Sequence, residues 1–320
     1  MARRRRAGRK LLGLFLPVLL VLLIGMCGWM WWVVSAVAHP PHHPYLVTPD
    51  KYFIPIKATD EHWHNEDGTE ARGWLLRGAE GAPAVVLLHG YGADRSWLLN
   101  LGVKINETTN CTVLWPDLRG HGENPAVSTT SFGTREAADV RAAVTFLRAL
   151  KTQQGRTLVG QRIGLYGVEL GAYAALLFSA QAPTDARPQA LVLDSPPASP
   201  DDLLRATIQA RTGLNNSFAQ ALARFGARGY FLGNYGNAPS CALAATLTDE
   251  HVLLLTGTDA GYLRESTVAL AQCFPAQAQV QLIDNLPLTG RNTASAPGEQ
   301  GEAYDRRVID FFDRVLRAQR

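Results

Sequence analysis

Short apolar runs recur along most of this chain, separated by longer segments with helical or irregular patterning. The runs have the length and β-branched content of buried strands. They lie at residues 84–88, 112–115, 163–166, 190–193, 252–255 and 280–283. With an antiparallel opening pair at 51–57 and 72–77, they predict a mostly parallel sheet of about eight strands. Strands that alternate with helices also predict helices on both faces of that sheet.

Helical periodicity is clearest in three places. Residues 134–152 place Val140, Val144 and Leu147 on or near one face, as an amphipathic helix requires. A final helix is predicted from about 302 to 318. Between the fourth and fifth of the apolar runs above, in the usual place of a lid, residues 201–246 predict a mainly helical insertion.

The N-terminus has a different pattern. Residues 11–38 carry no charge over 28 positions, and about 20 suffice to span a bilayer. Six cations precede this stretch, none directly follows it, and three tryptophans lie near its distal end: Trp29, Trp31 and Trp32. This predicts a single-pass membrane anchor, with a basic tail (1–10) in the cytoplasm and the domain outside. The alternative is a cleaved signal peptide ending at 36–38, although signal cores are shorter.

Charge excludes one class of partner. The net charge of +3 comes from 31 cations and 28 carboxylates, and six of the cations lie in residues 1–38. The remaining 25 cations against 28 carboxylates leave residues 39–320 near −3. No basic patch indicates nucleic acid. Residues 39–49 form a Pro/His-rich linker, whose prolines interrupt any regular metal-ligand spacing, and the domain follows at 50–320.

The cysteines leave two possibilities open. Cys241 and Cys273 flank one predicted strand and are candidates for a disulfide, which an extracytoplasmic location would permit. The alternative is that the thiols of the domain remain unpaired and mostly buried.

The most informative segment is Gly167-Val168-Glu169-Leu170-Gly171. An apolar run precedes it and a helical run of small residues follows. This is the strand–turn–helix setting of a G-x-S-x-G nucleophile elbow, in which glycines allow a sharp turn that lifts the middle side chain above the sheet. The middle residue here is Glu169 instead of serine.

Four motifs in order resemble the α/β-hydrolase superfamily, and within it the dienelactone-hydrolase and acyl-peptidase-like branch, over about residues 50–320. They are the HGYG at 89–92, the DLRGHG at 117–122, the elbow, and the GTD at 257–259. The resemblance implies the α/β-hydrolase fold. It also implies a triad running Ser, Asp or Glu, then His along the chain, with Asp259 in the acid position and Glu169 in the nucleophile position.

The histidine of this triad is missing. It should lie between the last strand and the last helix, near Arg291 and Asn292, but no histidine follows His251. In some enzymes of this fold a carboxylate is itself the nucleophile. An ester formed on Glu169 would still need a base to activate water for its release, and no histidine in the usual position offers that step.

Other groups at the predicted pocket edge are His89, Gly90, His121 and Ser195. His89 and His121 follow strands, where ligands bind in open α/β sheets, but the resemblance implies structural roles for both. Either histidine with Glu169 and Asp259 has the ligand types of a metal site, although without a spacing signature. Ser195 follows a strand but lacks an elbow sequence. The sequence therefore predicts no resident metal and no cofactor.

The resemblance places the oxyanion hole at the backbone N–H groups of Tyr91 and Leu170. We expect the Glu169 carboxylate to turn toward these donors or toward a nearby cation such as Arg291, filling the hole with its own oxygens. The alternative is a side chain in solvent above a vestigial pocket. The sequence predicts a membrane-anchored pseudohydrolase that retains a pocket for a small-molecule or peptide ligand. The other reading is an active hydrolase on ester, amide or thioester bonds that uses shifted groups.

Overall fold

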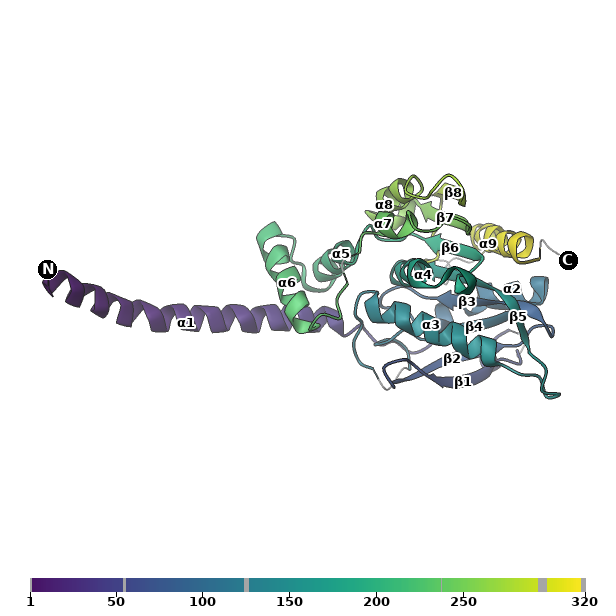
Figure 1. Ribbon diagram of the computed structural model, residues 1–320, viewed down its shortest axis with the longest axis horizontal. Coiled ribbons are helices and arrows are strands. Elements are labelled where there is room, and N and C mark those ends of the chain that lie inside the picture. Colours follow the sequence, from purple (N-terminus) through teal and green to yellow (C-terminus); the bar gives the residue numbers. More distant parts are fainter. Residues whose placement is uncertain (1, 54–55, 124–126, 237, 293–297, 318–320) are drawn as a thin grey trace.

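The computed structural model describes residues 2–53, 56–123, 127–236, 238–292 and 298–317, with side chains from residue 15 onward. Its centre is an eight-stranded sheet in the order β1-β2-β4-β3-β5-β6-β7-β8. β2 is antiparallel to both of its neighbours, and the strands from β4 to β8 pair in parallel. This confirms the predicted α/β-hydrolase fold (Figure 1).

The predicted central strands are found, and the first predicted strand is wrong. The strands are β1 (Thr59–His64), β2 (Glu70–Leu76), β3 (Ala82–Leu88), β4 (Thr112–Pro116), β5 (Val159–Val168), β6 (Ala190–Asp194), β7 (His251–Gly257) and β8 (Gln279–Leu286). The opening strand is Thr59–His64 and not 51–57. The polar sequence of β1 conceals it, because only Trp63 in this edge strand is buried.

Two layers of helices cover the sheet. The α-helices are α1 (Ala2–Ala38), α2 (Leu99–Thr109), α3 (Thr134–Ala149), α4 (Leu170–Gln181), α5 (Pro200–Thr212), α6 (Ser217–Tyr230), α7 (Ser240–Ala244), α8 (Leu263–Leu270) and α9 (Glu299–Arg317). α3 packs against α4, and α2 against α9. β3 shows why both faces are apolar: Val85 and Leu87 enter the core under α2 and α9, whereas Val86 and Leu88 enter the core under α3 and α4.

The insertion forms α5, α6 and α7; α5 and α6 lie beside the distal end of α1, whereas α7 packs against α4 and α8 (Figure 1). The segment Phe15–Ala38 is long and apolar enough to cross a membrane. Its last residues do not project freely, because Val33, Val34 and Val37 are fully buried against the domain. Of the two possibilities that the sequence left open for Cys241 and Cys273, the structure shows the disulfide, with 5.1 Å between the Cα atoms.

Candidate active site

The elbow has the backbone of a nucleophile turn. β5 ends at Val168, α4 begins at Leu170, and Glu169 between them has φ 47° and ψ −104°. A non-glycine residue at such a φ is strained and persists only where its surroundings fix it. The flanking glycines permit the close packing. A Cβ on Gly167 would lie 2.4 Å from backbone atoms of Gly171, and one on Gly171 would lie 2.4 Å from the Leu88 carbonyl oxygen.

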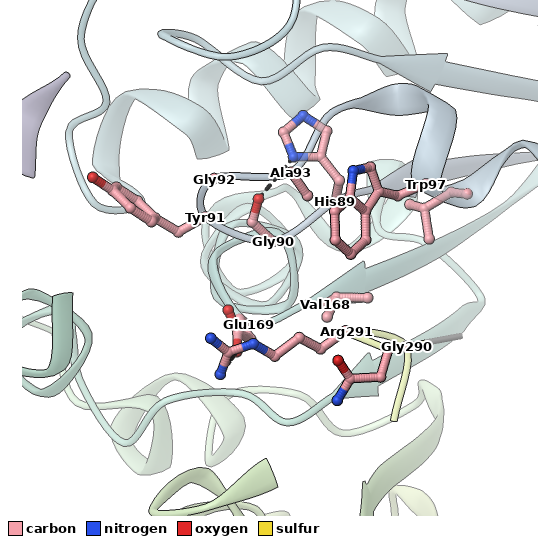
Figure 2. A pocket seen from close by; sticks show the side chains of 12 residues that line it. His89, Gly90, Tyr91, Gly92, Ala93, Trp97, Val168, Glu169, Gly290 and Arg291 are labelled. Carbon is pink, nitrogen blue, oxygen red and sulfur yellow. Dashed lines mark hydrogen bonds and ion pairs between the residues drawn. The ribbon is translucent and has the colours of Figure 1, made fainter. Parts of the chain in front are cut away.

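Glu169 points into a pocket and not into solvent. Its side chain is nearly buried and its Oε1 lies 3.2 Å from Nη1 of Arg291, which is 57% exposed. Figure 2 shows the two side chains next to each other, across from the loop that carries Gly90. Burial raises the pKa of Glu169 above its ordinary value of 4.5; Arg291 opposes this rise and Asp259 adds to it.

The carboxylate does not fill the oxyanion hole as we expected from the sequence. Among the described residues, neither the Tyr91 nor the Leu170 amide donates to Glu169. Its Oε2 instead lies against Gly90, 3.2 Å from where a Cβ there would stand. Of the two partners that the sequence suggested, the structure brings the cation to Glu169 and not the amides. Ion pairing to Arg291 explains this, because it draws the carboxylate toward the loop after β8.

Asp259 lies just past β7, in a short 3₁₀ turn (Thr258–Ala260). Its Oδ2 accepts hydrogen bonds from the Thr289 amide at 3.0 Å, from the Thr289 hydroxyl at 3.1 Å and from Nδ2 of Asn292 at 2.5 Å. Its Oδ1 is buried without a partner in the described structure. Asn292 therefore donates to the acid where a triad histidine would. The rest of the predicted histidine segment, from Thr293, lies outside the described residues.

Asp194, which no sequence motif indicated, holds the loop between these groups. This carboxylate ends β6, accepts a hydrogen bond from the Gly290 amide at 2.5 Å, and accepts one from the Tyr304 hydroxyl. Burial raises the pKa of Asp194 to about 6. Because Gly290 immediately precedes Arg291, Asp194 positions the Arg291 backbone. The signal was a carboxylate at the end of a buried apolar run.

A cavity of about 160 Å³ opens in front of Glu169. At ~30 Å³ for each water, this is space for about five waters, so it admits a small ligand or one end of a longer one. The segment after β3, the elbow and the loop after β8 line it. The lining residues are His89, Gly90, Tyr91, Gly92, Ala93, Trp97, Leu98, Val168, Glu169, Gly290, Arg291 and Asn292.

The two histidines near the pocket are buried, and each ring lies within hydrogen-bond distance of a backbone carbonyl oxygen, although His121 Nε2 has no partner in the described structure. His89 Nδ1 lies 2.8 Å from the Gly90 carbonyl oxygen, and its Nε2 accepts the Leu118 amide at 3.1 Å, so both ring nitrogens are used. His121 Nδ1 lies 2.9 Å from the Arg119 carbonyl oxygen. Burial lowers the pKa of His89 to about 4 and that of His121 to about 3. Both are neutral at pH 7, and His121 does not line the cavity.

Ser195 does not line the cavity, and the described residues form no metal site. Ser195 has φ 51° after β6, an elbow-like feature that its sequence did not reveal. It is nevertheless buried, donates its hydroxyl to Asp194 at 2.7 Å, and lies outside the cavity lining. Within the described residues, no group of three His, Cys, Asp or Glu side chains is arranged to hold a metal ion.

Chemically, the site offers a buried carboxylate, a half-exposed guanidinium and an acid held by an asparagine. It offers no hydroxyl or thiol nucleophile at the elbow. Asn292 cannot accept a proton as imidazole does, because a side-chain amide does not titrate in this range. The Ser–His–Asp proton transfers therefore have no carrier among the described residues.

Comparisons with known proteins agree with this fold. The esterase Pf2001 of Pyrococcus furiosus superposes with a TM-score of 0.65 at 21% identity, over 87% of this chain and 99% of that one. The alpha/beta hydrolase GrgF of Penicillium sp. sh18 gives 0.59 at 17% identity, over 82% and 100%.

One curated relative is similar over a short region. The thiohydrolase aneE of Aspergillus aculeatus is 29% identical over 111 residues, which are 34% of this chain and 33% of that protein. The sequence profile of the alpha/beta hydrolase family matches residues 85–309. This chain therefore belongs to the alpha/beta hydrolase family.

Proposed function

We propose that this protein is a membrane-anchored pseudohydrolase, which binds a small molecule or a peptide end in the elbow cavity without cleaving it. One observation carries the proposal: Glu169 lies at the elbow and pairs with Arg291, while Asn292 donates a hydrogen bond to Asp259. Nucleophilic attack lacks the elbow serine and proton transfer lacks the triad histidine, whereas the cavity is still formed.

In this proposal α1 is the anchor and the domain lies outside the cytoplasm. The charge asymmetry around the apolar segment supports this orientation. The Cys241–Cys273 bridge supports it as well, because disulfides persist in oxidising compartments. The net charge of about −3 over residues 39–320 supports the absence of a nucleic-acid partner.

Purified full-length protein in detergent, treated with a fluorophosphonate probe and a panel of ester and thioester substrates, tests the proposal. We expect no labelling, and no turnover above that of Glu169→Ala. Ligand-induced thermal shifts with small acids, amides and short peptides should be lost on filling the cavity by Gly90→Leu. Turnover that disappears in Glu169→Ala would overturn the pseudohydrolase assignment.

A second candidate, an active hydrolase that uses Glu169 itself, is favoured by the raised pKa of this carboxyl. Burial makes this carboxyl a stronger base than an exposed one, as a general base requires. The family match and the names of the relatives above agree with such an activity. The same assay decides, since this candidate requires turnover that depends on Glu169.

A further inference from the structure

The distal end of α1 meets the domain at a defined depth. Twenty helical residues span about 30 Å, the thickness of a hydrocarbon core. Counted from Leu11, the first residue after the basic tail, they end at Met30. The structure changes at the same point: residues 15–28 of α1 are exposed, whereas Val33, Val34 and Val37 are fully buried by the domain.

Helix α6 crosses α1 at this depth. A Cβ on Gly226 would lie 3.1 Å from Cβ of Met30, and the rings of Trp31 and Tyr230 are 4.7 Å apart between centroids. Figure 1 shows α6 running across α1 and not along it. If α1 spans the bilayer, α6 therefore lies along the membrane surface.

The outer face of α6 is apolar. Phe218, Leu222 and Phe225 are spaced four and three residues apart, so they share one face of the helix. Phe218 is 74% and Phe225 69% exposed. The opposite face packs on the domain through three buried residues, Gln220, Ala223 and Ala227.

The charge of this insertion also differs from that of the rest of the domain. Residues 201–246 contain four arginines and two aspartates, a net charge of about +2, whereas residues 39–320 as a whole sum to about −3. Two of these arginines, Arg224 and Arg228, lie on α6, where their guanidinium groups are 4.0 and 3.9 Å from the Asp201 carboxylate. A basic helix with an exposed aromatic face is typical of elements that lie in an anionic membrane interface.

We propose that α6 is an interfacial membrane helix, whose strip Phe218–Leu222–Phe225 inserts into the headgroup–acyl boundary of an anionic phospholipid bilayer. Leu232, which follows α6 and is 85% exposed, extends this apolar surface. The inference rests on the membrane anchorage proposed above. It adds that the helical insertion, and not α1 alone, holds the domain at the bilayer surface.

Site-specific quenching in proteoliposomes tests this. Full-length protein is reconstituted in phosphatidylcholine–phosphatidylglycerol vesicles with nitroxide lipids, and one environment-sensitive fluorophore is placed at Phe218→Cys or Phe225→Cys in a Cys27→Ser background. Cys111 is buried and Cys241–Cys273 is bridged, so the new thiol is the accessible one. Gln153→Cys, exposed on the α3–β5 loop at the amino-terminal end of β5 and so at the other end of this strand from the elbow, is the control.

We expect several-fold stronger quenching at positions 218 and 225 than at Gln153→Cys, and stronger quenching by a nitroxide near the headgroup than by one at the bilayer centre. Native Cys27, exposed on α1, reports the anchor separately. Quenching at Cys27 with none on α6 would overturn this inference and leave the anchor intact. No quenching at either would overturn both. If the α6 fluorophores are not quenched by nitroxide lipids but show energy transfer between two copies of the protein, the apolar strip belongs to a dimer interface and the inference is overturned.

Discussion

Two walls of the same pocket, the elbow and the loop after β8, differ in what they keep of a hydrolase. The elbow keeps the backbone: Glu169 has the strained φ of a nucleophile turn, and glycines allow β5, α4 and β3 to approach closely. The loop keeps the position but not the chemistry, since Asn292 donates to Asp259 where imidazole would. In this chain the elbow packing is therefore independent of a serine at its centre, whereas activity in any fold depends on a few groups.

Rebuilding the chemistry on the retained backbone should have the largest effect. The double variant Glu169→Ser/Asn292→His supplies a hydroxyl at the elbow and a base hydrogen-bonded to Asp259. Because a positioned general base contributes about 10²–10⁴-fold, we expect ester hydrolysis to rise by that factor over Glu169→Ser alone, measured with an activated ester.

The matched control for this rebuilding is Glu169→Ser/Asn292→Gln, which keeps a polar side chain but adds no base. Adding Asp259→Asn to the active double variant should lower the gain again. A folded double variant that hydrolyses no faster than either single variant would show that the retained elbow is not a competent scaffold.

The elbow backbone itself is tested by Gly171→Ala. The new Cβ would lie 2.4 Å from the Leu88 carbonyl oxygen and 2.7 Å from that of His89. Because these are backbone atoms, strain of about 2–3 kcal/mol is expected in the free energy of unfolding, measured by urea denaturation.

Gly229→Ala in α6 is the control for Gly171→Ala. No heavy atom lies within 4 Å of the new Cβ there, and alanine in a helix gains up to about 1 kcal/mol over glycine. Equal effects of the two variants would mean that close packing does not fix the elbow.

The same contrast explains what the sequence could predict. Buried apolar runs and glycine spacing are local signals, so the sequence predicted the central strands and the turn at the elbow; the role of Asp259 as the acid stays a prediction. The pairing of Glu169 with Arg291 was one of two suggested arrangements, and only the path of the loop decides between them. Asp194 was missed because its partners, Gly290 and Tyr304, are about a hundred residues away in sequence. The polar strand β1 was missed because it lies at the edge of the sheet, where burial leaves little pattern.

The loop after β8 is tested by Asn292→Ala. The variant removes the 2.5 Å hydrogen bond to Asp259, whose other oxygen already lacks a partner in the described structure. Hydrogen bonds to charged groups contribute about 1.5–3 kcal/mol when buried; for this partly buried pair we expect a loss of about 1–2 kcal/mol in unfolding free energy. Asn285→Ala, at an exposed position of β8, should change little. An equal loss of unfolding free energy in both variants would show that Asn292 does not hold Asp259 in place.

The smallest expected effect concerns the charge of Glu169. Since burial raises its folded-state pKa above 4.5, its contribution to stability is fully present below pH 4.5 and is lost as pH rises through the folded pKa. Glu169→Gln removes this dependence. It also removes the pair with Arg291, which contributes about 1 kcal/mol or less because the arginine is half exposed.

Urea denaturation of both proteins at pH values from 4 to 8 separates the two contributions. The unfolding free energy of Glu169→Gln minus that of the wild type should become more positive as pH rises. The wild type loses stability because it must ionise a buried carboxyl, whereas the variant has none. Arg291→Gln should steepen the wild-type decline, since it removes the cation that opposes the pKa rise. A difference that falls with pH instead would mean that the ion pair outweighs burial, and the elbow carboxylate would then be a stabilising element of this wall.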